Sequence, residues 1–208
     1  MNFTEEDIMW PFKNKRSKED MSNDPEVQFI VGMKYDFGHG VNKDPKKAVI
    51  WYTKAAEQGH ASAQCNLGVC YGTGSGVERD LHKAVMWYAK AAERGEPMAQ
   101  YNLGVCYAEG DGVNKDLRKA AILYSKAAEQ GYADAQYELG VCYERGIGLN
   151  QDMKNAIKWY TKAAKNGNAK AQHRLGECYH FGLGVNKDLH KAFDWLKKAA
   201  EQGEAGAQ

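Results

Sequence analysis

Apolar residues recur along this chain with the spacing of two alternating amphipathic helices. We count positions, called slots, from a leading glutamine such as Gln100, which is slot 1. Small or aliphatic residues and a tyrosine at slots 36, 4 and 8 follow a 3.6-residue period and predict a first helix, A, from about slot 34 of one copy to slot 10 of the next. A second apolar set at slots 21, 22, 24, 25, 28 and 29 predicts a second helix, B.

This two-helix pattern occurs five times in succession, with a period of 36 residues and no insertion. The copies cover residues 28–63, 64–99, 100–135, 136–171 and 172–207. A fixed period of this length is typical of a solenoid built from one supersecondary unit. We therefore predict an all-α repeat domain over residues 24–208. Residues 1–23 form a charged leader, in which Trp10 and Phe12 either dock or belong to a flexible arm.

Residues that start and stop helices support this register. An aspartate at slot 17 is a good N-cap for helix B, and the Asp-Pro pairs at Asp24 and Asp44 add a proline at the first helical position. Glycines at slots 11 and 32 fit the position just after a helix, and Pro97 marks the start of another helix A. A further glycine, at slot 5, lies in mid-helix, where it costs up to ~1 kcal/mol against alanine. We expect another helix to pass too close for a Cβ there.

These slots resemble the Sel1-like repeat family, whose helix pairs are related to the tetratricopeptide class. The shared pattern is A-x-A-Q-x-x-L-G-x-x-Y-x-x-G-x-G-V-x-x-D-x-x-K-A-x-x-W-Y-x-K-A-A-E-x-G, and it extends from Asp24 to Gln208. The resemblance implies a right-handed α/α superhelical solenoid whose concave groove is lined by A helices. It also implies a non-enzymatic scaffold or adaptor that binds proteins, and points to bacterial relatives. The copies depart from the pattern at Val31, Lys34, Leu123 and Leu196.

Composition narrows the function further. With 28 Lys+Arg against 27 Asp+Glu, the net charge of +1 offers no field to attract nucleic acid. No apolar run approaches the roughly 20 residues that span a bilayer. The N-terminal residues lack the basic and apolar regions of a signal peptide, so we expect a reducing, cytoplasmic location. Secretion by another route stays open, and the oligomeric state is not specified.

The cysteines and histidines predict packing rather than chemistry. Cysteine recurs at slot 7, where equivalent residues on adjacent helices lie roughly 8–10 Å apart, beyond the Cα separation of about 4.4–6.8 Å that a disulfide needs. These cysteines are Cys70, Cys106, Cys142 and Cys178, with Cys65 at slot 2. Some relatives bridge helix A to helix B, but helix B has no cysteine here. No zinc-ligand spacing or catalytic motif occurs, so we expect no catalytic residue, metal or cofactor. A hydrolase, as suggested for some β-lactam-binding relatives, or a host-interaction effector is the alternative.

The candidate binding residues lie on helix A opposite its core face, at slots 3, 6 and 10. Slot 6 is mostly valine, and slot 3 varies in charge between copies. The residues are Asn66, Val69, Thr73, Asn102, Val105, Glu109, Glu138, Val141, Arg145 and Arg174. Because asparagine both donates to and accepts from a peptide backbone, we expect an extended or helical partner segment to bind here. Packing against the neighbouring repeat explains the valines equally well.

Overall fold

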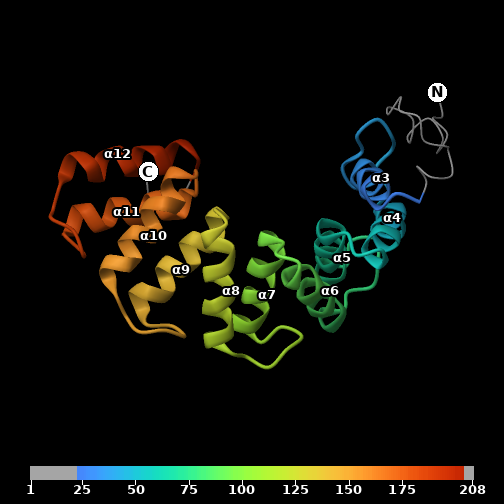
Figure 1. Ribbon diagram of the computed structural model, residues 1–208. Coiled ribbons are helices and arrows are strands. Elements are labelled where there is room, and N and C mark those ends of the chain that lie inside the picture. The colour runs from blue at the N-terminus through green and yellow to red at the C-terminus, as the bar shows by residue number, and fades with distance from the viewer. Residues whose placement is uncertain (1–22, 204–208) are drawn as a thin grey trace. The chain divides into compact units, whose positions relative to one another are not determined.

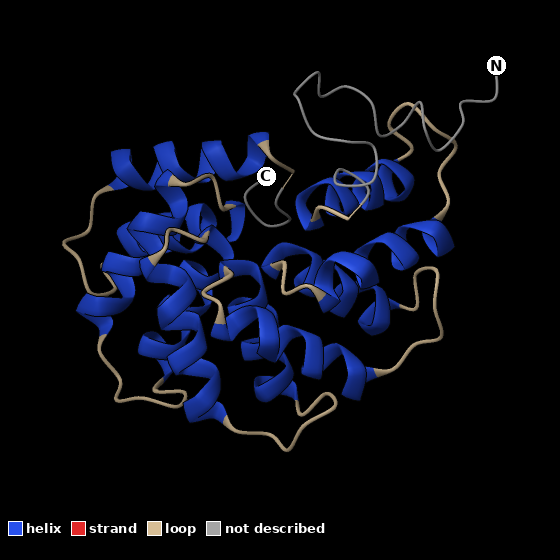
Figure 2. Ribbon diagram, turned by 45° about the vertical axis from the view of Figure 1, so that its right-hand side comes forward, coloured by secondary structure: helices blue, strands red, loops and turns tan. Residues whose placement is uncertain are grey.

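The computed structural model describes residues 23–203, and this part of the chain contains α-helices and no strand (Figures 1 and 2). The A helices are α3 (Pro25–Phe37), α5 (Ala61–Thr73), α7 (Pro97–Glu109), α9 (Ala133–Arg145) and α11 (Ala169–Phe181). The B helices are α4 (Pro45–Glu57), α6 (Leu81–Glu93), α8 (Leu117–Glu129), α10 (Met153–Lys165) and α12 (Leu189–Glu201). The predicted fold of five helix pairs is confirmed. Trp10 and Phe12 lie outside the described residues.

The chain divides into two compact units. The described part of unit 1 is residues 23–99 and 111–113, and that of unit 2 is residues 100–110 and 114–203. In unit 1, α4 packs against both α3 and α5, and α5 packs against α6. In unit 2, α8 packs against α9, α9 against α10, α10 against α11 and α11 against α12. Within each unit, a B helix therefore fills the space between its own A helix and the next one.

The helix boundaries follow local side-chain chemistry. Asp44 lies in extended conformation before α4, and its carboxylate accepts the backbone N–H of Lys47 at 3.1 Å. The aspartates at slot 17 of the other copies cap α6, α8, α10 and α12 in the same way. The A helices α3, α5, α9 and α11 are each followed by a glycine with positive φ, such as Gly74 at 79°. The predicted N-caps and helix-ending glycines are thus confirmed.

The glycine at slot 5 leaves room for a side chain of helix B. A Cβ built on Gly68 would lie 2.6 Å from two ring carbons of Tyr88, at slot 25 of the same repeat. The same contact measures 2.6 Å between Gly32 and Tyr52 and between Gly140 and Tyr160. The expected close approach of another helix is confirmed: the ring makes the nearest contact, and the backbone oxygen of Ala84 on the same helix as Tyr88 lies 3.3 Å from the Cβ built on Gly68. Alanines of helix B that are almost fully buried, such as Ala55 and Ala163, complete the core.

A buried glutamine at slot 1 joins successive repeats. Its amide nitrogen donates to the carbonyl at slot 29 of the preceding repeat, as Gln64 does to Ala56 at 3.0 Å. Its carbonyl oxygen accepts from an amide at slot 31 of its own repeat, as Gln28 does from Gln58 at 2.8 Å. The slot 1 side chain is 3–5% exposed in every copy, so these bonds satisfy a buried polar group. Gln64 lacks the second bond, because slot 31 of its repeat is Arg94. The sequence pattern marks this glutamine but does not show its partners.

Candidate protein-binding surface

The ten predicted contact residues lie on α5, α7, α9 and α11. Those in unit 1 are Asn66, Val69 and Thr73, and the other seven are in unit 2. The residues at slots 3 and 6 are half-buried, and those at slot 10 are exposed. We call these positions the A-helix surface of each unit. The half-burial arises because slots 3 and 6 also contact other parts of the repeats.

The slot 6 residues contribute to packing as well as to the surface. Val105 packs against the buried cluster of unit 2 that contains Tyr124 and Leu139. Met33, at the same slot of the first copy, packs against the core cluster of unit 1. Packing therefore accounts for part of the apolar character of slot 6. This was one of the two explanations that the sequence pattern allowed, the other being partner binding. The half of each side chain that stays accessible can still contact a partner.

In unit 1, the slot 3 residue belongs to a polar group. The hydroxyl of Tyr52 donates to the carboxylate of Asp36, at slot 9, at 3.2 Å. The amide of Asn66, at slot 3 of the next repeat, faces the same hydroxyl and partly opposes the rise in its pKa. Burial raises the pKa of Tyr52, so the hydroxyl stays protonated and available as a donor. Asn66 therefore lies beside a hydroxyl that is itself held by Asp36.

In unit 2, the equivalent group is charged. The hydroxyl of Tyr160 donates to Glu144 at 2.5 Å, and the guanidinium of Arg174 donates to both Glu144 and Glu177. Burial alone would raise the pKa of Glu144, but the hydrogen bonds from Arg174 and Tyr160 more than offset it, and the pKa falls below its usual value. Arg174, predicted to contact a partner, thus also links successive repeats.

The hydrogen bond from the slot 25 hydroxyl to the slot 9 carboxylate is a feature that the apolar pattern did not predict. The apolar pattern places slot 25 on helix B and does not single out slot 9. The signal was available, because the copies with Asp36 and Glu144 at slot 9 both carry a tyrosine at slot 25. Such a pair on adjacent helices of one repeat suggests a hydrogen bond from a hydroxyl to a carboxylate.

Glu138 is the acidic residue at slot 3. Its half-buried carboxylate makes no hydrogen bond with any residue in 23–203. Burial raises its pKa, while the positive charges of Lys170 and Arg145 oppose the shift. It also interacts electrostatically with Tyr101 and Tyr124. This carboxylate can accept hydrogen bonds from a ligand.

The thiols are buried and unreactive in character. All five cysteines are buried, and none of them forms a disulfide. Burial raises the pKa of Cys70, Cys142 and Cys178 to about 11, so their thiolates are scarce at neutral pH. Among the described residues, no group of three His, Cys, Asp or Glu side chains could hold a metal ion. Nor does the described part of the chain contain a helix long and apolar enough to cross a membrane.

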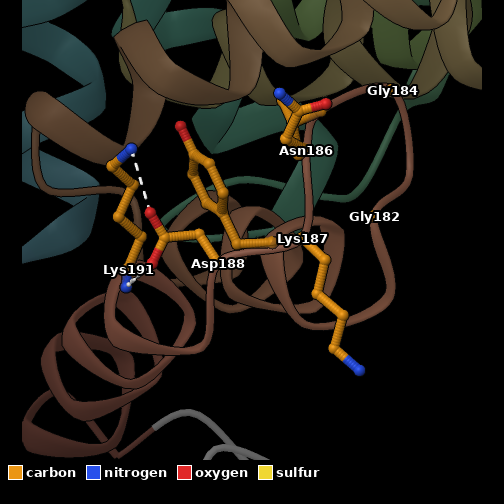
Figure 3. Close-up of a pocket in the computed structure, with 8 residues that line it drawn as sticks. Gly182, Gly184, Asn186, Lys187, Asp188 and Lys191 are labelled. Carbon is orange, nitrogen blue, oxygen red and sulfur yellow. Dashed lines mark hydrogen bonds and ion pairs between the residues drawn. The ribbon is translucent and has the colours of Figure 1, made fainter.

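A recess of about 740 Å³ lies at the loop between α11 and α12 (Figure 3). Its polar groups belong to the cap of α12. Asp188 accepts the backbone N–H of Lys191 at 3.0 Å and pairs with the Lys191 ammonium at 3.1 Å, the contact drawn dashed in Figure 3. The hydrogen bond from the Lys191 backbone, followed by its side chain, lowers the pKa of Asp188. These contacts explain the recess as helix-capping structure.

The family model for the Sel1 repeat matches five consecutive segments of this chain. They are residues 25–60, 61–96, 97–132, 133–168 and 169–204. The chain therefore belongs to the Sel1 repeat family, whose members generally serve as protein-interaction scaffolds. Each match begins at the first residue of an A helix, three residues before the glutamine from which we counted.

Solved structures of bacterial proteins are similar to this chain. The Sel1 repeat protein from Oxalobacter formigenes is 35% identical, with a TM-score of 0.86, over 97% of this chain and 80% of its own. The protective antigen c5321 of uropathogenic Escherichia coli strains is 40% identical, with a TM-score of 0.81, over 88% of this chain. The match spans only 39% of c5321. The immunity protein Pa5087 from Pseudomonas aeruginosa is 28% identical, with a TM-score of 0.58, over 84% of this chain and 67% of its own. A comparison with curated proteins gave no match.

Proposed function

We propose that this protein is a non-enzymatic scaffold that binds a segment of a protein partner on the A-helix surface of unit 2, with Glu138 as the principal anchor. The observation that carries this proposal is the half-buried carboxylate of Glu138, which has no hydrogen-bond partner among residues 23–203. A carboxylate removed from water is destabilised unless donors surround it. A partner that supplies an N–H or a cationic side chain relieves this cost.

The neighbours of Glu138 on α9 define the rest of the contact. Val141 and Arg145 lie three and seven residues further on, so the three side chains share one face of the helix. Val141 is half-buried and Arg145 is exposed. A suitable segment therefore carries a donor for Glu138, an apolar side chain for Val141 and an acceptor for Arg145. Asn102, Val105 and Glu109 on α7, and Arg174 on α11, flank this face in the repeat sequence.

The A-helix surface of unit 1 offers a second contact, whose side chains are uncharged. Asn66 and Val69 are half-buried, and Thr73 is exposed. Asn66 lies beside the Tyr52 hydroxyl, and its amide can donate to and accept from a peptide backbone. Buried thiols with a raised pKa argue against a cysteine nucleophile. Five cysteines with no disulfide suit a reducing compartment such as the cytoplasm.

Peptide arrays probed with the whole chain test this proposal. Peptides retained by the wild type are then titrated against Glu138→Gln and Val141→Glu. We expect at least a tenfold loss of affinity in each variant. Ile122→Glu is the matched control, because Ile122 is a 57% exposed apolar residue on α8 of the same unit. Equal affinity in all of these proteins, each verified as folded by circular dichroism, contradicts the proposal. So does turnover of a substrate that one side-chain change abolishes.

A further inference from the structure

A second recess, of about 660 Å³, lies in unit 1 where helices α4 and α6 end. Gln64 of α5 lines it, together with Trp87 and Lys90 of α6 and with Arg94, the residue that follows α6. We call it the Arg94 pocket. None of these residues belongs to the A-helix surface described above.

Four of the five repeats show what normally faces this glutamine. The slot 31 side chain is a carboxamide, and its N–H donates to the slot 1 glutamine at 2.8–2.9 Å. The pairs are Gln58 with Gln28, Gln130 with Gln100, Asn166 with Gln136, and Gln202 with Gln172. In the second repeat, slot 31 is Arg94. The second repeat therefore lacks the carboxamide that completes this contact in the other copies.

The missing carboxamide leaves Gln64 half satisfied. Gln64 is only 4% exposed, and its Nε2 donates to the carbonyl of Ala56 at 3.0 Å. Its Oε1 is buried and has no hydrogen-bond partner in the described part of the chain. A buried acceptor without a donor is unfavourable, so this atom favours any ligand that supplies an N–H.

Arg94 offers the complementary group. Its side chain turns toward the preceding repeat, where a Cβ built on Gly59 would lie 2.8 Å from its Nη2. The guanidinium makes no hydrogen bond or ion pair with any residue of the described range 23–203. By contrast, a Cβ at the equivalent Gly131 or Gly167 would meet nothing within 4 Å. An acceptor and a strong donor, both unpaired, therefore line the same pocket.

We propose that the Arg94 pocket binds a primary carboxamide, the group carried by asparagine and glutamine side chains of a partner protein. The ligand N–H donates to Oε1 of Gln64, as the slot 31 carboxamides do in the other copies. Its carbonyl oxygen accepts from the guanidinium of Arg94. Because Oε1 is buried, Arg94 must shift as the ligand enters, and no hydrogen bond holds it back.

The surroundings of the pocket favour a neutral ligand of this kind. Lys90 and Arg94 contribute two positive charges, and Glu57 and Glu93 contribute two negative charges. The Lys90 ammonium lies 4.2 Å from the centre of the Trp87 ring, where a cation–π interaction partly stabilises its charge. With no net charge at its rim, the pocket does not select a carboxylate over a carboxamide. Trp87 and Ala56 provide an apolar wall for the carbon atoms of the ligand.

Nuclear magnetic resonance titration of the whole 15N-labelled chain with propionamide tests the proposal. We expect saturable shifts of the Trp87 indole N–H and the Gln64 side-chain N–H signals. N,N-dimethylpropionamide, which has no N–H, and propionate, which is an anion, should leave these signals unshifted. A glutamine-containing peptide tests the protein source of the group, with the matching glutamate peptide as its control.

Two variants make the result decisive. Arg94→Gln supplies an internal carboxamide, so it should raise the melting temperature and weaken propionamide binding at least tenfold. Asn166→Arg removes the carboxamide from the fourth repeat, and it should create a second propionamide site reported by Gln136 and Trp159. The proposal is overturned if propionamide gives no saturable shift while Arg94→Gln still raises the melting temperature, because water alone then fills the pocket. An equal response to the dimethyl compound, or undiminished binding by Arg94→Gln, also overturns it.

Discussion

Gly68→Ala and Gly72→Ala make the same substitution at two positions of one helix. The first position is crowded, and the second has room for a Cβ. Both residues belong to α5, and neither has a positive φ, so the backbone accepts alanine at both positions. At Gly68, the new Cβ would lie 2.6 Å from ring carbons of Tyr88 and 3.3 Å from the carbonyl oxygen of Ala84. At Gly72, one turn later, the nearest atoms are the Tyr88 hydroxyl at 3.5 Å and the Ala84 Cβ at 3.7 Å.

These distances predict that the two substitutions change the folding stability in opposite directions. Alanine in place of glycine gains up to ~1 kcal/mol of helix propensity in mid-helix. Overpacking a core typically costs about 1–3 kcal/mol, and Tyr88 is only 7% exposed, so its ring has little freedom to move. We expect Gly68→Ala to destabilise the fold by about 1–2 kcal/mol. Gly72→Ala should stabilise it by about 0.5 kcal/mol, because it adds a contact of ordinary length near the end of the helix.

Urea unfolding followed by circular dichroism measures the difference. Midpoints are compared only where the dependence of unfolding free energy on urea is unchanged, since repeat arrays can unfold in stages. Gly176→Ala adds an intermediate case, because its Cβ would meet the aliphatic side chain of Leu196 at 2.7 Å rather than an aromatic ring. If Gly68→Ala is as stable as the wild type, the glycine at slot 5 is not needed to accommodate the slot 25 side chain. Equal shifts at Gly68 and Gly72 refute the reasoning in the same way.

Two further predictions concern ionisable groups. Cys70, Cys142 and Cys178 have a pKa of about 11, so a thiol reagent at neutral pH should modify them slowly in the folded protein and rapidly in urea; fast modification of the native protein contradicts their burial. Arg174→Met removes the donor that lowers the pKa of Glu144. The pairing of Arg174 with Glu144 stabilises the fold at pH values above the ordinary glutamate pKa of about 4.3. This stabilisation is lost as the pH falls through the lowered pKa of Glu144 in the folded protein. The stability difference between this variant and the wild type should therefore shrink in acid, and a difference independent of pH counts against the pairing.

The helical period predicted which A-helix positions stay accessible, but not their contacts. Slots 3 and 6 of the candidate residues are half-buried rather than fully exposed, and slot 10 is exposed. The period cannot tell that Arg174 is held by Glu144, or that Glu138 has no such partner, because these states depend on the side chain that a neighbouring repeat presents. Binding at these residues stays a prediction until it is measured.

The sequence by itself determined the period, the ten helices of the described region and the residues that begin and end them. These features are local, since Asp44 caps its helix through a residue three positions away and Gly74 ends α5 through its own φ. Only the tertiary structure decided which distant groups meet. It placed the Tyr88 ring against Gly68 and left Gln64 without the carboxamide that completes the other copies. The physical reason is that a repeat pattern reports what each position contains, whereas packing between helices decides which atoms come within contact distance.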